Sequence, residues 1–119
     1  MHIGQDTQQR DDRRAHRKSV ESTEPVINVI TGLSMGHIGN MSRTGVMLIG
    51  ATRPDSNAIY QIILPLPLKN GTTLNIEVGV QEQWHDQAAS TDQYWVGYRI
   101  VAISDEDHAR LQNWLELPE

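Results

Sequence analysis

The spacing of apolar residues divides the chain into three parts. Residues 1–18 are polar and charged and show no apolar periodicity. Between Pro25 and Ile103, short apolar and β-branched runs alternate with glycine, asparagine, aspartate and proline, which is typical of strands joined by turns. After Ser104 the apolar residues recur at helical spacing. The pattern predicts a polar N-terminal segment, a β domain and one terminal helix.

Six segments have the composition of strands, and the fifth alternates most clearly. Asn70-Gly71 before it suits a two-residue hairpin turn with positive φ at both central positions. Its apolar and polar residues fall on opposite faces: Leu74, Ile76, Val78, Val80 and Trp84 against Asn75, Glu77, Gln81 and Gln83. The six expected strands are 26–33, 37–42, 45–51, 59–66, 73–84 and 92–103.

The last element is expected to be a helix that begins after Ser104. Serine is a favourable N-cap, and the three acidic residues that follow it interact well with the positive end of the helix dipole. Leu111, Trp114 and Leu115 share one face, and Pro118 ends the element.

These elements predict an all-β fold with one C-terminal helix. We expect a six-stranded antiparallel β-barrel over residues 19–119, with the helix packed against it. Residues 1–18 are expected to form a flexible basic arm. At 119 residues the chain has the length of one domain with a single core.

Composition limits the location and the partners of the protein. No cysteine is present, no segment approaches the roughly 20 apolar residues of a membrane-spanning helix, and the N-terminus lacks the apolar stretch of a secretory signal. A cytoplasmic protein without a membrane partner is expected. The net charge is −5, yet five of the ten Lys and Arg residues lie between residues 10 and 18. A basic segment on an acidic body suits a small anionic ligand better than a nucleic acid.

Reactive residues are not arranged for catalysis. The five histidines show no metal-ligand spacing, none stands in a Ser/His/Asp arrangement, and no glycine-rich phosphate loop is followed by lysine. We expect no enzyme activity, no catalytic residue, no metal site and no cofactor.

The first segment with candidate binding chemistry is DRRAHRK, residues 12–18. Arg13 and Arg17 are separated by three residues, with Arg14 between them. A guanidinium group can stack on a purine and can donate two parallel hydrogen bonds to guanine or to a phosphate. The segment is therefore either a disordered basic tail or an arm that wraps a compact, doubly charged nucleotide.

The second segment is the turn GNMSRTG, residues 39–45. Asn40 can accept and donate hydrogen bonds, Ser42 can bond a phosphate or a base edge, and Gly45 permits close backbone approach. The turn is therefore either a capped bend before a core strand or the floor of the same ligand site.

Together the two segments resemble the two binding motifs of the PilZ domain family, R-x-x-x-R and [D/N]-x-S-x-x-G. The matching residues are RRAHR at 13–17 and NMSRTG at 40–45, and VGYRIVAIS at 96–104 lies where these domains carry a glycine-containing strand before the last helix. The resemblance covers residues 10 to about 115. Ala15 and Ile100 stand where the family often has bulkier residues, which affects packing rather than the ligand motifs.

The resemblance implies a receptor for cyclic di-GMP, the bacterial second messenger. In the family, the arginines of the arm clasp the guanines and phosphates, the turn binds a guanine, and a surface side chain often stacks on a base. For Trp84, such a stacking role and a place in the core are both open. Carried over, the ligand-binding residues are Arg13, Arg14, Arg17, Asn40, Ser42, Gly45 and Trp84.

The expected function is that of a non-catalytic sensor. Its arm would order over the barrel on binding cyclic di-GMP and present a changed surface to an unidentified downstream protein. One alternative is a PilZ-like adaptor that acts through protein contacts without binding nucleotide. Another is a small barrel for single-stranded nucleic acid, which the acidic body and the few aromatic residues disfavour.

Overall fold

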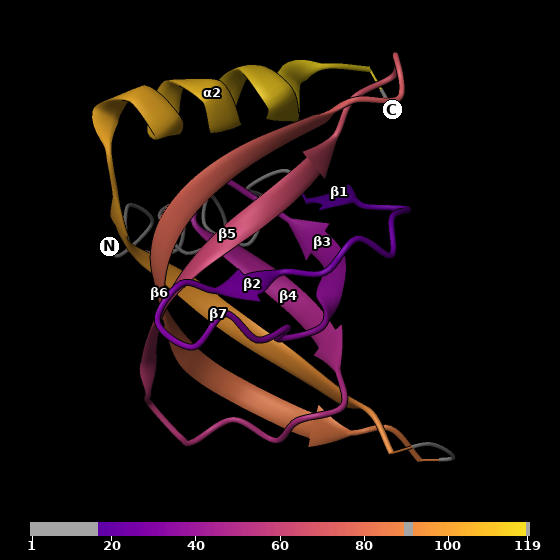
Figure 1. The fold of residues 1–119 in the computed structure, drawn as a ribbon, viewed down its shortest axis with the longest axis vertical. Coiled ribbons are helices and arrows are strands. Elements are labelled where there is room, and N and C mark those ends of the chain that lie inside the picture. Colours follow the sequence, from indigo (N-terminus) through magenta and orange to yellow (C-terminus); the bar gives the residue numbers. More distant parts are fainter. Residues whose placement is uncertain (1–16, 90–91, 119) are drawn as a thin grey trace, which may run out of the picture.

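The computed structural model describes residues 17–89 and 92–118, and within them it contains seven strands and one helix (Figure 1). The strands form one antiparallel sheet in the order β1-β3-β4-β7-β6-β5-β2. The elements are β1 (Lys18–Ser19), β2 (Ile27–Asn28), β3 (His37–Met41), β4 (Gly45–Gly50), β5 (Ile59–Pro67), β6 (Thr73–Gln87), β7 (Tyr94–Ile103) and α2 (Asp105–Glu116).

The sheet curls into an open half-barrel, and α2 lies across one end of it (Figure 1). The edge strands β1 and β2 are two residues long and pair with β3 and β5 rather than with each other. Edges this short offer few backbone groups for further pairing. The expected closed six-stranded barrel is therefore wrong, since the described part of the chain forms an open sheet of seven strands.

The largest difference from the expected strands lies at 26–33, where only β2 pairs as a strand. The chain then turns, because Asn28 Oδ1 accepts hydrogen bonds from the backbone N–H of Ile30 (2.9 Å) and of Thr31 (3.2 Å). Across the turn, Asn28 N–H donates to the carbonyl of Leu33 (2.9 Å). The β-branched residues favoured a strand, but an asparagine that binds the backbone ahead of it makes a turn.

The hairpin between β5 and β6 is confirmed, but its expected turn type is wrong. Leu68 N–H donates to the Thr72 carbonyl (2.9 Å), and Gly71 N–H donates to the Leu68 carbonyl (3.1 Å). Gly71 has φ of 86°, whereas Asn70 keeps a negative φ. The loop is therefore three residues long, a turn completed by a left-handed glycine. Asn70 Oδ1 accepts from the Thr72 hydroxyl (2.6 Å) and so contributes through its side chain.

The C-terminal helix is confirmed and closes one end of the core. Ser104 Oγ caps it by accepting from Asp107 N–H (3.1 Å). Leu111 and Trp114 are buried against the concave face of the sheet, and Trp114 Nε1 donates to the Pro67 carbonyl (2.9 Å). Within residues 17–89 and 92–118, no helix is long and apolar enough to cross a membrane.

Lys18 ties the first strand to this helix. The residue is 6% exposed, and its ammonium lies 4.1 Å from the centre of the Trp114 ring. It donates to the carbonyls of Trp114 (2.8 Å) and Leu117 (3.1 Å), where a helix without basic residues in its last turn needs a cation. The boundary expected between arm and domain, after residue 18, thus falls inside β1.

Candidate functional site

The turn between β3 and β4 is built around the Ser42 hydroxyl. Ser42 N–H donates to the Gly45 carbonyl (2.9 Å), which closes the turn. Its Oγ accepts from the N–H of Gly45 (3.2 Å) and of Thr44 (3.3 Å). Ser42 is 1% exposed, so its hydroxyl is buried inside the turn and bonds to the backbone of the turn. Contact between this hydroxyl and a ligand stays a prediction.

Gly45 is required by the neighbouring strand rather than by a left-handed backbone. Its φ is not positive, unlike that of Gly71. A Cβ built on Gly45 would lie 2.7 Å from the carbonyl oxygen of Tyr98 on β7, closer than real Cβ contacts. The group that approaches Gly45 is thus the main chain of β7. A close approach of the Gly45 backbone to a ligand stays a prediction.

Arg17 and Asn40 meet beside this turn. Arg17 Nη1 donates to Asn40 Oδ1 at 2.6 Å, although the residues are 23 positions apart. The pairing follows from the sheet, because β1 places Ser19 opposite Asn40. Asn40 Nδ2 lies 3.9 Å from the sulfur of Met47 on β4. Arg13 and Arg14 of the expected site lie outside the described residues.

Trp84 lies on the outer face of the sheet because β6 is bulged. The register with β7 shifts between Glu82 and Trp84, so the strict alternation expected for this strand is wrong after Glu82. Glu82 takes the inward position and is 3% exposed, while Trp84 is 46% exposed. The indole covers Gly97 so closely that a Cβ there would overlap it. The core position for Trp84 is thus excluded.

Two partners of the Glu82 carboxylate and one partner of its backbone hold the bulge in place. Oε1 accepts from Asn57 N–H (2.8 Å), and Oε2 lies 2.8 Å from His85 Nδ1. The backbone N–H of Glu82 also donates to Ala58 (2.9 Å). The hydrogen bond from Asn57, followed by the contact with His85, lowers the pKa of Glu82 below its ordinary value. A charged carboxylate at an inward position therefore fixes the strand that presents Trp84.

These residues border one hollow of about 630 Å³ on the convex side of the sheet, which we term the outer hollow. Its size is that of an ordinary small-molecule site, roughly 300–1,000 Å³. No acidic residue of the described chain lines it, although the whole chain carries a net charge of −5. The lining residues on which the argument below depends are Arg17, Asn40, Gly45, Met47, Trp84 and Arg99.

Arg99 is a residue of this hollow that the motifs did not identify. It follows Tyr98 on β7, so it faces outward like Gly97, and its Nη2 donates to Gln81 Oε1 (3.2 Å). The alternation of β7 was the available signal, because inward Val96 and Tyr98 imply an outward Arg99. The hollow thus brings together four of the seven expected residues (Arg17, Asn40, Gly45 and Trp84) and adds a second guanidinium.

Within the described ranges, no group of three or more His, Asp or Glu side chains is placed to hold a metal ion. The groups that the outer hollow does offer are guanidinium, amide and indole, which bind anions and planar rings.

Comparison with known proteins bears on the fold. No family model matches the sequence, and no curated protein matches it. The structure resembles that of the inhibitor of motility MotI/DgrA of Bacillus subtilis, with a TM-score of 0.67 and 16% sequence identity, over 83% of this chain. The matched region is 46% of that chain, so this protein spans less than half the length of MotI/DgrA. The likeness supports a PilZ-like β fold with one C-terminal helix.

Proposed function

We propose that the chain is a receptor for cyclic di-GMP, which binds in the outer hollow. The observation that carries the proposal is the combination, in one hollow, of two guanidinium groups and an exposed indole, with no carboxylate from the described residues. Cyclic di-GMP offers two phosphates and two guanines, which are complementary to these groups. The PilZ-like fold and the two matching motifs support the same ligand.

Each group in the outer hollow has a distinct task in this proposal. Arg17 keeps one N–H on Asn40 and has further donors for a phosphate or for the O6 and N7 edge of guanine. Arg99 supplies the second cation, and Trp84 supplies a flat, half-exposed surface on which a guanine stacks. Arg13 and Arg14 are proposed to complete the clasp from the N-terminal side.

Ser42 and Gly45 act on the shape of the site in this proposal. Ser42 holds the turn closed, and Gly45 lets the turn lie against the main chain of β7. Both are required for the ligand because they place Asn40 and Thr44 at the edge of the outer hollow.

The first test is a calorimetric titration of the whole chain with cyclic di-GMP, with GTP and single-stranded DNA as controls. We expect saturable binding of cyclic di-GMP alone. Arg17→Ala should weaken it by about 5- to 150-fold, the effect of one bidentate contact. Arg17→Lys should not restore it, because an ammonium cannot form the same fork. Arg53→Ala, an exposed arginine that does not line the outer hollow, is the matched control.

A second candidate function is an adaptor that uses the same face for a protein partner without a nucleotide. It is favoured by Trp95, which is 48% exposed and lies two residues before Gly97 on the outer face of β7. Tryptophan is enriched in the energetic centres of protein interfaces. A parent chain that gives no heat with cyclic di-GMP would overturn the receptor proposal and favour the adaptor.

A further inference from the structure

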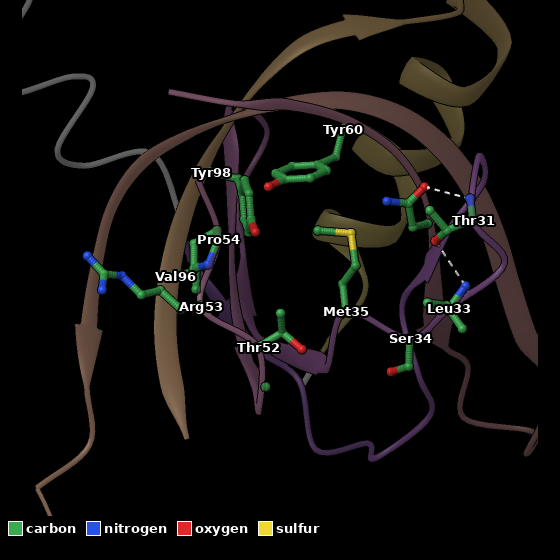
Figure 2. Close-up of a pocket in the computed structure, with 12 residues that line it drawn as sticks. Thr31, Leu33, Ser34, Met35, Thr52, Arg53, Pro54, Tyr60, Val96 and Tyr98 are labelled. Carbon is green, nitrogen blue, oxygen red and sulfur yellow. Dashed lines mark hydrogen bonds between the residues drawn. The ribbon is translucent and has the colours of Figure 1, made fainter. Parts of the chain in front are cut away.

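A second cavity opens on the concave side of the half-barrel, facing away from the outer hollow. Its volume is about 170 Å³. It lies between the turn that follows β2, the end of β4 with the residues 52–54 that follow it, and the inner faces of β5 and β7 (Figure 2). It belongs to neither motif of the sequence, and the proposed nucleotide site makes no use of it.

Two tyrosines form one wall of this cavity. The rings of Tyr60 and Tyr98 meet edge to face, with centroids 6.1 Å apart and planes at 86° (Figure 2). The Tyr60 hydroxyl accepts from Asp55 N–H (3.3 Å). Tyr98 is 5% exposed, and its hydroxyl has no hydrogen-bond partner among residues 17–89 and 92–118.

Among the described residues, the side-chain polar atom that is both fully buried and unpartnered is His37 Nδ1, not the Tyr98 hydroxyl. The Tyr98 hydroxyl is therefore reached from the cavity that it lines, where a water molecule or a ligand group can accept its hydrogen bond. Burial also raises the pKa of Tyr98 well above its ordinary value, so the group stays a neutral donor. The cavity beside it is the place from which a bonding partner can come.

The rest of the lining selects for an uncharged, mainly apolar occupant. Met35 and Val96 contribute apolar surface, and Figure 2 shows the Met35 thioether reaching toward the tyrosine rings. No acidic residue of the described ranges lines the cavity, and the guanidinium of Arg53 points away from it (Figure 2). Thioether and aromatic walls favour an aromatic ring.

The volume of the cavity limits the size of the ligand it can hold. A cavity of about 150 Å³ in a protein interior holds one benzene molecule. The 170 Å³ measured here therefore accommodates one ring with a small substituent. We propose that this cavity binds one small uncharged aromatic molecule of the size of phenol, whose polar group pairs with the Tyr98 hydroxyl.

The turn after β2 lies at the entrance of the cavity, and its amide signals can report whether the ligand is bound. Its side chains Ile30 and Leu33 are 82% and 68% exposed, and Leu33 lines the cavity. Exposed apolar side chains at the mouth of an apolar cavity cover a ligand more favourably than they face water. Occupancy should therefore be reported by the amide signals of this turn.

The test is an NMR titration of the whole chain with phenol and with toluene, which has the same ring without a hydroxyl. Both probes should shift the Met35 methyl signal, and phenol should bind more tightly. Tyr98→Phe removes only the unpartnered hydroxyl, so the fold is retained. This variant should bind phenol about 2- to 12-fold more weakly, the effect of one hydrogen bond, and toluene as the parent does.

Two further variants complete the design. Thr52→Trp, at an exposed position on the rim, should block both probes. Tyr94→Phe removes a tyrosine hydroxyl that does not line the cavity, and it should bind both probes as the parent does. The inference is overturned if phenol leaves the Met35 methyl unshifted, or if Tyr98→Phe binds phenol with the affinity of the parent. Binding of cyclic di-GMP is measured separately and decides neither result.

Discussion

Ser42→Ala tests whether the turn between β3 and β4 is held by one buried hydroxyl. The variant removes the acceptor of two backbone N–H groups, those of Thr44 and Gly45, at a site where Ser42 is 1% exposed. Water cannot replace the lost hydroxyl without entering the turn, so the cost is that of leaving buried donors unsatisfied. We expect the free energy of unfolding to fall by about 1–3 kcal/mol.

The assay is thermal unfolding followed by circular dichroism, without ligand. For a chain of this length, about 3–6 °C is lost per kcal/mol, so the melting temperature should fall by about 3–18 °C. Arg43→Ala is the matched control, since it truncates an exposed side chain in the same turn and should cost less than about 0.5 kcal/mol. A Ser42→Ala melting temperature equal to that of Arg43→Ala would refute the assignment of the hydroxyl to the turn.

Three further expectations concern side chains that fix the sheet. Gly97→Ala should displace the half-exposed indole of Trp84 rather than unfold the sheet, so the indole N–H resonance moves while the melting temperature changes little. The pKa of Glu82 is lowered in the fold, so its contribution to the free energy of unfolding is present above the ordinary carboxyl pKa of about 4.3 and is lost as pH falls through the lowered pKa. Glu82→Gln should therefore unfold at a lower urea concentration than the parent at pH 7. Between about pH 5 and 3, urea titration should show that this variant loses less stability than the parent. Lys18→Met removes the donor to the Trp114 carbonyl and should lower the urea midpoint by the equivalent of about 1–3 kcal/mol.

Periodicity was sufficient for elements whose pairing needs no special side chain. The strands expected at 37–42, 45–51 and 59–66 match β3, β4 and β5 to within one residue at each end. The helix was equally accessible, because its cap at Ser104 is encoded locally. In these segments the side-chain pattern and the backbone hydrogen bonds specify the same element.

Local patterns failed where one side chain redirects the backbone. Asn28 ended a β-branched run by bonding two N–H groups ahead of it. Glu82 moved Trp84 to the outer face, but its N–H partner Asn57 is 25 positions away. The alternation of apolar and polar residues in β6 does not indicate such a distant partner, so the bulge could not be predicted from the sequence of that strand alone.

The candidate site could be predicted only in part, because some of its residues are brought together by strand pairing that short motifs do not show. The turn and Arg17 were identified from short motifs, and the sheet brings them together across 23 positions. Arg99 carries no motif, and its place in the outer hollow depends on which strand β7 pairs with. Ser42 was identified, but whether its hydroxyl faced a ligand or the turn depended on backbone geometry.

The anchoring of β1 changes how the arginines should contribute to binding. An arm that is ordered only by its ligand forfeits about 1–2 kcal/mol for each backbone residue it fixes. Lys18 is already held by the carbonyls of Trp114 and Leu117, and Arg17 by Asn40. The guanidinium of Arg17 is therefore positioned before the ligand arrives, and its contacts carry little of that ordering cost. Preorganised contacts retain more of their energy. Removal of the Arg17 side chain should therefore reduce the binding free energy of cyclic di-GMP by the full energy of the hydrogen bonds between Arg17 and the ligand.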